Sequence, residues 1–305
     1  MKKQQLLDEV FALGNNRSVW DMKEAQMKIA EHHESARGKD PQLSDMFVII
    51  DAFVVENERG DTDETYAVTR PIFDRLRKEK DWDFYDVRIF VVALGFYMGG
   101  FERLNSDANT ALEKLKEYFY KDEYPLIKLA VHMNATTCML RLRHFEEEVR
   151  NHPDNLKRFE EHFLFHIDAA LVICKEEGIT PAMADAMIRK GAFFGDQALI
   201  DEAFDVLEKF GDKDLMCLLK RSLDRFRESE IYINEARELN AIIGQNINKF
   251  RTARGVSRHD LGMAIGVLPS QIDFIESGHK NISVHALHKA ASFLGTSTNC
   301  LLEPE

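Results

Sequence analysis

Cysteine is scarce in this chain and is nowhere arranged for metal or redox chemistry. The four cysteines lie far apart, each inside an apolar helical pattern, at Cys138, Cys174, Cys217 and Cys300. Zinc sites and redox motifs need cysteines a few residues apart, and none are placed in this way. We therefore expect reduced thiols in a cytoplasmic protein, with no metal and no cofactor.

Long apolar runs are missing as well. The longest uncharged run, IFVVALGFYMGGF at 89–101, is shorter than the roughly 20 residues that cross a bilayer. Near the N-terminus Asp8 and Glu9 interrupt the apolar residues, which is unlike a signal peptide. We therefore expect no association with a membrane.

The sequence also lacks the motifs of common enzymes. We find no glycine-rich phosphate loop, no nucleophile elbow and no identifiable pair of catalytic carboxylates. His162 and His166, four residues apart beside Glu161, have a spacing that can hold zinc, but a third ligand is missing. Two partly buried histidines are the favoured interpretation, and a hydrolase or metalloprotein that uses them is the alternative. An enzyme is therefore not expected.

Positive charge is in deficit over most of the chain. The formal net charge is −12. Residues 240–305 hold six Lys or Arg and five Asp or Glu, a net charge of +1, so residues 1–239 hold 34 and 47, a net charge of −13. An acidic surface repels the phosphates of nucleic acids. If the protein binds DNA, the C-terminal part must do so.

Helical periodicity is abundant. Apolar residues recur at spacings of three and four, strand-like alternation is rare, and only seven prolines interrupt the pattern. The expected helices are 3–13, 19–36, 44–58, 63–79, 82–99, 106–120, 124–142, 155–176, 181–193, 197–209 and 213–229, before the C-terminal part. Expected N-caps are Ser44, Asp81, Ser106, Asp154 and Thr180, and expected C-terminal glycines are Gly38, Gly60, Gly178, Gly195 and Gly211. The sequence therefore predicts an all-α protein.

Three segments share a pattern of residue types that suggests helical repeats. Residues 81–97, 122–138 and 155–174 each begin polar and aromatic and then become strongly apolar. They begin 41 and 33 residues apart, close to the period of stacked two-helix repeats. One such hairpin cannot bury its own apolar face, so stacking follows. We therefore expect a tetratricopeptide-like helical-repeat array at 1–229, with an irregular helical bundle as the alternative.

No linker rich in proline or glycine separates the last part of the chain. Residues 226–250 continue as one helical pattern, so we expect a connecting helix at 230–242 and a C-terminal domain at 243–305. Glycines close four of the five short helical segments of that domain, at Gly255, Gly266, Gly278 and Gly295. A small residue, Gly262, lies where the second and third segments would cross, which is typical of helix-turn-helix geometry.

The C-terminal domain resembles the phage-repressor and Cro-type helix-turn-helix family, often called XRE-like. The resemblance rests on I-G-x-x-I-x-x-x-R at 243–251, S-x-x-x-L-G at 257–262, G-V at 266–267 and I-x-x-I-E-x-G at 272–278. It implies a five-helix domain that binds double-stranded DNA. Because the domain is nearly neutral, one copy would bind weakly, and we expect a homodimer on paired half-sites.

The resemblance also assigns residues to the DNA contact. They are Ser257 and Arg258 beside phosphates at a helix N-terminus, Pro269, Ser270, Gln271, Asp273 and Phe274 toward the bases, and His279, Lys280 and Asn281 in the loop that follows. Ser270 and Gln271 can hydrogen-bond to base edges, whereas Asp273 can accept only from cytosine. Phe274 suits a thymine methyl and equally suits a protein partner.

Residues 80–177 resemble the helical-repeat domain of Rgg-type peptide-sensing regulators, through WDFYDVRIFVVALGFY and LIKLAVHMNATTCMLR. Those regulators usually carry the DNA-binding domain first, so the domain order is reversed here. The resemblance implies a concave surface that binds a short peptide through amide and guanidinium groups. The expected contacts are Asn134, Thr137 and Arg141 on one helix face, with Arg88 and His132 as further candidates. An outward-facing polar stripe or a structural hydrogen bond is the alternative for the first three.

These expectations combine into one hypothesis and one alternative. The hypothesis is a cytoplasmic, homodimeric transcriptional regulator in which a helical-repeat domain senses a short peptide or protein effector. The alternative is a protein-interaction adaptor or antirepressor, whose helix-turn-helix domain binds another regulator instead of DNA.

Overall fold

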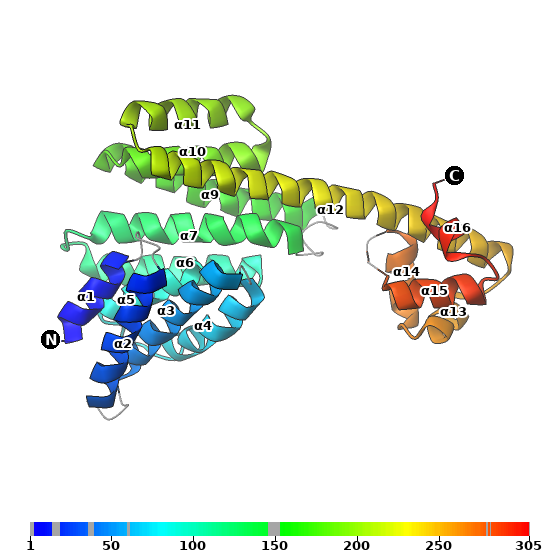
Figure 1. Cartoon of the computed structure of the whole chain (residues 1–305), viewed down its shortest axis with the longest axis horizontal. Coiled ribbons are helices and arrows are strands. Elements are labelled where there is room, and N and C mark those ends of the chain that lie inside the picture. The colour runs from blue at the N-terminus through cyan, green and yellow to red at the C-terminus, as the bar shows by residue number, and fades with distance from the viewer. Residues whose placement is uncertain are drawn as a thin grey trace. The chain divides into compact units, whose positions relative to one another are not determined.

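The computed structural model describes residues 3–13, 19–35, 40–59, 62–145, 153–278, 280 and 282–304. Every regular element within those ranges is a helix, so the chain is all-α, as the sequence predicts (Figure 1). None of the helices in these ranges has both the length and the apolar character needed to span a bilayer.

The chain divides into two compact units, Met1–Cys217 and Leu218–Glu305, which we call unit 1 and unit 2. The division falls inside one long helix, α12 (Lys213–Ala253). The boundaries expected from the sequence, at residues 229 and 243, lie further along this helix and stay predictions.

Unit 1 is built from helices that each pack on the next one along the chain. They are α1 (Lys3–Leu13), α2 (Val19–Ser35), α3 (Pro41–Arg59), α4 (Thr62–Leu76), α5 (Phe84–Leu94), α6 (Phe101–Leu115), the 3₁₀ helix η1 (Lys116–Tyr118), α7 (Tyr124–Phe145), α9 (Pro153–Glu177), α10 (Thr180–Phe194) and α11 (Gln197–Phe210). In Figure 1, α7, α9, α10 and α11 lie in succession, and neighbours in this series are in contact. Such packing is what a stacked array of helical hairpins requires. The specific tetratricopeptide-like type stays a prediction.

Two aromatic clusters occupy the core of unit 1. The ring centroid of Phe73 lies 5.2 Å from those of Phe90 and Tyr97, and both pairs meet edge to face. Further along the chain, Phe163 of α9 stacks on Phe193 of α10 at 3.8 Å. Complete burial of such a side chain stabilises a fold by roughly 2–3 kcal/mol. The apolar faces of the helices therefore hold the array together, as expected when short helices are not stable alone.

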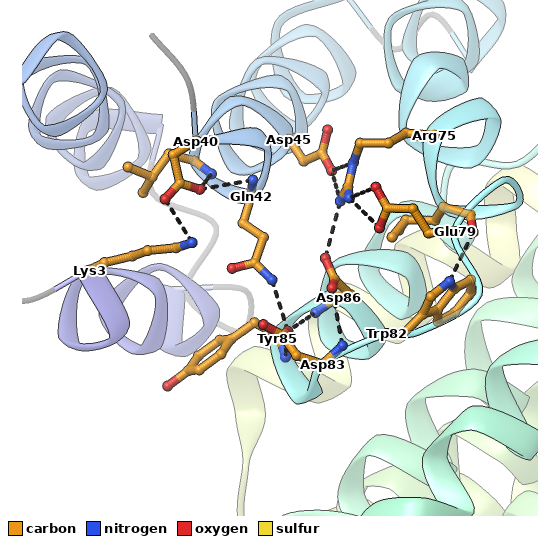
Figure 2. Close-up of polar contacts among 12 residues, drawn as sticks. Lys3, Asp40, Gln42, Asp45, Arg75, Glu79, Trp82, Asp83, Tyr85 and Asp86 are labelled. Carbon is orange, nitrogen blue, oxygen red and sulfur yellow. Dashed lines mark hydrogen bonds and ion pairs between the residues drawn. The ribbon is translucent and has the colours of Figure 1, made fainter. Parts of the chain in front are cut away.

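A polar network links α3, α4 and α5 beside this core (Figure 2). Arg75 of α4 donates to the carboxylates of Asp45 of α3 and Asp86 of α5. It also donates to Glu79, one turn further along the chain. Burial raises the pKa of Asp45 to about 6, although Arg75 acts in the opposite direction. One cation therefore serves three carboxylates at this junction.

Helix α5 is shorter at both ends than the sequence predicts. The side chain of Asp83, not of Asp81, accepts from the backbone N–H of Tyr85 and Asp86. The Asp86 carboxylate in turn accepts from the backbone N–H of Asp83, which completes a capping box. At the other end the helix stops at Leu94 instead of residue 99. From the sequence alone, Asp81 and Asp83 are equally good N-cap candidates. Only the hydrogen bonds in the structure show that Asp83 is the cap.

The other predicted N-caps of unit 1 also differ from the observed helix starts. Each lies inside a helix or is its first residue: Ser44 in α3, Ser106 in α6, Asp154 in α9 and Thr180 in α10. For α3 the reason is visible, because the Asp40 side chain accepts from the backbone N–H of Gln42 and Leu43, ahead of Ser44. The predicted glycines Gly195 and Gly211 are confirmed at left-handed φ values of 72° and 85°.

Unit 2 contains the remainder of α12 and four short helices around a separate apolar core. The helices are α13 (Arg258–Ile265), α14 (Pro269–Glu276), α15 (Val284–Phe293) and α16 (Thr298–Leu302). The buried side chains include Ile243, Ile247, Leu261, Ile265, Ile272, Ile275, Leu287, Ala291, Leu294 and Leu301. With the end of α12 as the first helix, this is the five-helix domain that the sequence predicts.

Candidate functional site

The turn between α13 and α14 is fixed by local sequence. Ser257 caps α13, since its hydroxyl accepts from the backbone N–H of Asp260 at 3.1 Å. Gly266 ends α13 at a φ of 79°, a left-handed conformation that favours glycine. Pro269 then begins α14 at a position where its missing N–H costs nothing. The sequence therefore sets two short helices with a tight turn between them.

Glycine also allows the two helices to cross closely. A Cβ atom at Gly262 would lie 3.0 Å from the carbonyl oxygen of Val267 and 3.1 Å from Cα of Pro269. On the other side, a Cβ at Gly244 of α12 would collide with the carbonyl oxygen of Ile275 in α14. Helix α14 is thus held between α12 and α13 by backbone contacts that a larger residue would disrupt.

A buried ion pair anchors the C-terminal end of α14. The Glu276 side chain is only 2% exposed, and its carboxylate accepts from Nε and Nη2 of Arg251 in α12. Arg251 also donates through Nη1 to the carbonyl oxygen of Val256 at 3.0 Å. A buried carboxylate needs such compensation, because its desolvation is costly. Sequence reasoning missed this pair, although both residues stand at fixed positions in the quoted motifs.

The exposed side of α14 carries a mixed surface, which we call the outer face: Ser270, Asp273, Phe274 and Ser277. These residues recur at helical spacing, while Ile272 and Ile275 point into the core. Three of the five residues expected to touch bases, Ser270, Asp273 and Phe274, therefore share one exposed side. The other two, Pro269 and Gln271, are half-buried. Phe274 is 53% exposed and adds an apolar group to this face.

The described residues that we expect to contact phosphate already form contacts within unit 2. Ser257 is exposed, but its hydroxyl donates to the Asp260 carboxylate at 2.7 Å. Arg258 forms ion pairs with Asp273 at 2.6 Å and with Glu276 at 2.8 Å. Lys280 is half-buried, and its backbone N–H donates to the carbonyl oxygen of Phe274 at 3.1 Å. The remaining two predicted residues, His279 and Asn281, lie outside the described residues.

The polar residues expected to bind a peptide are used inside unit 1. Asn134 of α7 donates through Nδ2 to the carbonyl oxygen of Val91 in α5 at 2.8 Å. Arg141 donates to the carbonyl oxygen of Gly95 at 3.0 Å and pairs with Glu56 of α3 at 2.6 Å. These bonds fasten α7 to α5 and to α3. This geometry agrees with the alternative interpretation of Asn134 and Arg141, in which they form structural hydrogen bonds.

Thr137 follows the same pattern through a residue that sequence reasoning missed. Its hydroxyl donates to the carbonyl oxygen of Met133 at 2.9 Å and accepts from Nη1 of Arg189 in α10. Arg189 also pairs with Asp185 at 2.7 Å. Its only signal in the sequence was the Asp–Arg spacing of four residues, which is common on exposed helix faces. The α7 side chains are therefore held by three different helices.

The two weaker peptide candidates also have internal partners. Arg88 pairs with Asp8 of α1 at 2.7 Å, and its guanidinium carbon lies 4.0 Å from the ring centroid of Phe11. His132 is buried, and its Nδ1 lies 2.9 Å from Nδ1 of His166, so one ring donates and the other accepts. The five candidates therefore do not form one open groove, and the peptide-binding assignment gains no support from their geometry.

His132 of α7 and His166 of α9 form a buried histidine pair between these two helices. Burial lowers the pKa of His132 to about 4, with a smaller contribution from Lys128. Burial likewise lowers the pKa of His166 to about 3, helped by the positive charge that His132 and His162 would carry. Across the described ranges, no three His, Cys, Asp or Glu side chains cluster closely enough to hold a metal ion. Both rings are therefore neutral near pH 7.

Comparison with known proteins identifies the C-terminal part of the chain. Residues 247–299, which run from the end of α12 into α16, match the helix-turn-helix family of domains. No curated protein and no solved structure matches the chain. The chain thus carries a helix-turn-helix domain, as the sequence predicts, and this domain supports a DNA-binding transcription regulator. The resemblance of residues 80–177 to Rgg-type regulators stays a prediction.

Proposed function

We propose that the protein is a DNA-binding transcription regulator that binds duplex DNA through the outer face of α14. The observation that carries the proposal is the helix-turn-helix match at residues 247–299, combined with an exposed second helix that bears Ser270. A helix of this kind enters the major groove and reads base edges with polar side chains. The preceding helix, α13, would place its N-terminus beside a phosphate.

The protein would bind DNA as a homodimer. Unit 2 has few basic residues, and two of them, Arg251 and Arg258, are already engaged by Glu276. Most DNA affinity comes from neutralised phosphates, so one such unit binds weakly. Two copies on half-sites about one helical turn apart would add their contacts. This makes a palindromic operator the expected target.

Unit 1 would act as the sensor of this regulator in the cytoplasm. The first 239 residues carry a net charge of −13, so this region does not favour contact with DNA. A stacked helical array offers extended surfaces for a peptide or protein effector. Because the five predicted peptide contacts have internal partners, the effector would bind elsewhere on unit 1. Effector binding would then change the affinity of the protein for its operator.

The test is a salt titration of DNA binding by the full chain. Fluorescence anisotropy with a labelled mixed-sequence duplex should show binding at low ionic strength. The logarithm of the association constant should then fall linearly with the logarithm of salt concentration, by about 0.9 per phosphate contact. Selection from a random duplex library would next identify the operator, and light scattering would report the oligomeric state. Absence of any duplex binding at low salt, with and without cell extract as a source of effector, would refute the proposal.

A second candidate function, a protein-interaction adaptor or antirepressor, is favoured by one specific observation. Unit 2 exposes three large apolar side chains on or beside the helix-turn-helix, Met263, Leu268 and Phe274, each more than half exposed. Apolar residues and an acidic Asp273 suit a protein surface better than a phosphate backbone. In that case the full chain would ignore duplex DNA and bind another regulator. A Phe274→Ser variant would then lose the partner.

A further inference from the structure

Arg258 has a position suited to phosphate but a side chain directed elsewhere. It is the first residue of α13, at the helix N-terminus that would face the DNA backbone. Its guanidinium group instead reaches α14. Nε donates to Oε2 of Glu276 at 2.8 Å, and Nη1 lies 2.6 Å from Oδ1 of Asp273. The cation is thus held between two carboxylates.

These two carboxylates have different roles. Glu276 is 2% exposed and is already paired with Arg251, whose side chain is only 12% exposed. Glu276 therefore has its own cation and would remain compensated if Arg258 moved away. Asp273 is different, because its side chain is 63% exposed and Arg258 is its ion-pair partner. Glu276 thus holds Nε of Arg258, and Asp273 holds Nη1 at the surface.

Asp273 also lies where a negative charge is unfavourable for DNA binding. It belongs to the outer face of α14, next to Phe274 and one turn from Ser270. A carboxylate on this face approaches the phosphates, which repel it, and it cancels the positive charge of Arg258 at the same time. An exposed ion pair of this kind is weak, so a modest change is enough to release Nη1 of the guanidinium group.

We infer that Asp273 sets the DNA affinity of the protein by retaining the Nη1 end of Arg258 on α14, so that this end of the guanidinium group is withheld from a phosphate. The inference rests on the proposed function. Asp273 is here a positioning residue, which acts on DNA through Arg258. A base-reading role for Asp273, as an acceptor from cytosine, is the competing explanation.

Replacement of Asp273 by asparagine tests the inference. Asn has the same shape but no charge, so Arg258 keeps its contact with Glu276 through Nε, while Nη1 becomes available to a phosphate. With a mixed-sequence duplex of about three helical turns, Asp273→Asn in the full chain should bind about five- to tenfold more tightly at 0.1 M salt. The slope of the logarithm of the association constant against the logarithm of salt should steepen by about one phosphate contact. Weaker binding by Asp273→Asn would support base reading and overturn the inference.

A second substitution separates retention of Arg258 from simple repulsion by Asp273. Arg258→Met removes the guanidinium group and keeps an unbranched apolar stem. If Asp273 acts through Arg258, the double variant Arg258→Met/Asp273→Asn should bind no more tightly than Arg258→Met alone. If the same gain appears in the Arg258→Met background, the carboxylate only repels phosphate and the inference is wrong.

Controls distinguish this failure from failure of the proposed function. Glu303→Gln removes the same charge from the exposed C-terminal end of unit 2 and should leave the affinity within about twofold of wild type. Thermal unfolding of each variant checks that unit 2 remains folded. If wild type binds duplex and Asp273→Asn binds no better, only the inference fails. If neither protein binds duplex at low salt, DNA binding itself is refuted and the inference falls with it.

Discussion

Helices α7 and α14 both carry polar side chains on an apolar framework, but they use them in opposite ways. On α7, Asn134 and Arg141 donate to carbonyl oxygens of Val91 in α5 and of Gly95 directly after it. On α14, Ser270 and Asp273 face solvent, and the outer face has no other helix of unit 2 covering it within the described residues. In sequence the two patterns look alike. A polar stripe therefore indicates a binding surface only after its internal partners have been identified.

Helix α14 contains one side chain that behaves like those of α7. Glu276 points inward and pairs with Arg251, so it belongs to the structure and not to the outer face. The comparison predicts that polar side chains with partners inside the protein control stability. The polar side chains of the outer face should instead control binding. The following experiments test this division.

Removal of Glu276 should have the largest effect. Glu276→Ala leaves the cation of Arg251 buried without its partner, and we expect the free energy of unfolding of unit 2 to fall by about 3–5 kcal/mol. Urea unfolding of the full chain, followed by circular dichroism, measures the change. Glu303→Ala, at an exposed position, should change it by less than about 0.5 kcal/mol. Equal stability of the two variants would show that Glu276 is not structural.

Acid should weaken unit 1 through the histidine pair. The folded pKa values of His132 and His166, about 4 and 3, lie below the ordinary value of 6.5. The unfolded chain therefore binds more protons, so the contribution to stability is complete above about pH 6.5 and is lost as the pH falls toward 4 and 3. At pH 5 each histidine should cost about 2 kcal/mol of unfolding free energy.

A variant without the pair isolates this effect. His132→Asn/His166→Asn cannot titrate in this range, so its unfolding free energy should change less between pH 7 and pH 5 than that of wild type. His162→Gln, at a half-buried position, should keep most of the wild-type pH dependence, because burial is the main cause of the lowered pKa of His166. Asp45 acts in the opposite direction, because its raised pKa of about 6 favours protonation in the folded state, and it is common to all three proteins. The prediction would be contradicted if the unfolding free energies of wild type and His132→Asn/His166→Asn changed equally between pH 7 and pH 5.

Truncation of Asn134 should have a moderate effect on stability and none on binding. Asn134→Ala leaves the carbonyl oxygen of Val91 without its side-chain donor, and we expect a loss of about 1–3 kcal/mol from unit 1. Chemical denaturation measures the loss, and a DNA titration of the same sample checks that affinity is unchanged. A stable Asn134→Ala protein that no longer responds to effector would instead restore the peptide-binding hypothesis for α7.

Truncation of Ser270 should have the smallest effect on stability and a clear one on binding. Ser270 is exposed on the outer face, so Ser270→Ala should change the unfolding free energy by less than about 0.5 kcal/mol. Loss of one hydrogen bond to a base edge should weaken operator binding by about tenfold or less. Competition titrations against wild type measure the ratio. Unchanged affinity for every duplex would place the contact surface elsewhere.

Much of the fold can be predicted from the spacing of apolar residues and from the residues that begin and end helices. The helices, the left-handed glycines at Gly195 and Gly211, and the core of unit 2 all follow from local patterns. Helix starts are less predictable, as Asp83 in place of Asp81 illustrates, because neighbouring polar residues compete for the same capping role. The candidate site is predicted in part: Ser270, Asp273 and Phe274 are exposed as expected, but the two carboxylate partners of Arg258 were not foreseen.

The sequence by itself determined an all-α chain, a helix-turn-helix domain at its C-terminal end and the separation of an acidic region from a nearly neutral one. These properties depend on neighbours within a few turns, or on simple sums of charge. The tertiary structure alone decided which polar side chains are available. Asn134 meets its acceptor 43 residues away, and Arg258 meets Asp273 across a turn between two helices. Such pairings depend on how helices pack, and no local spacing encodes them.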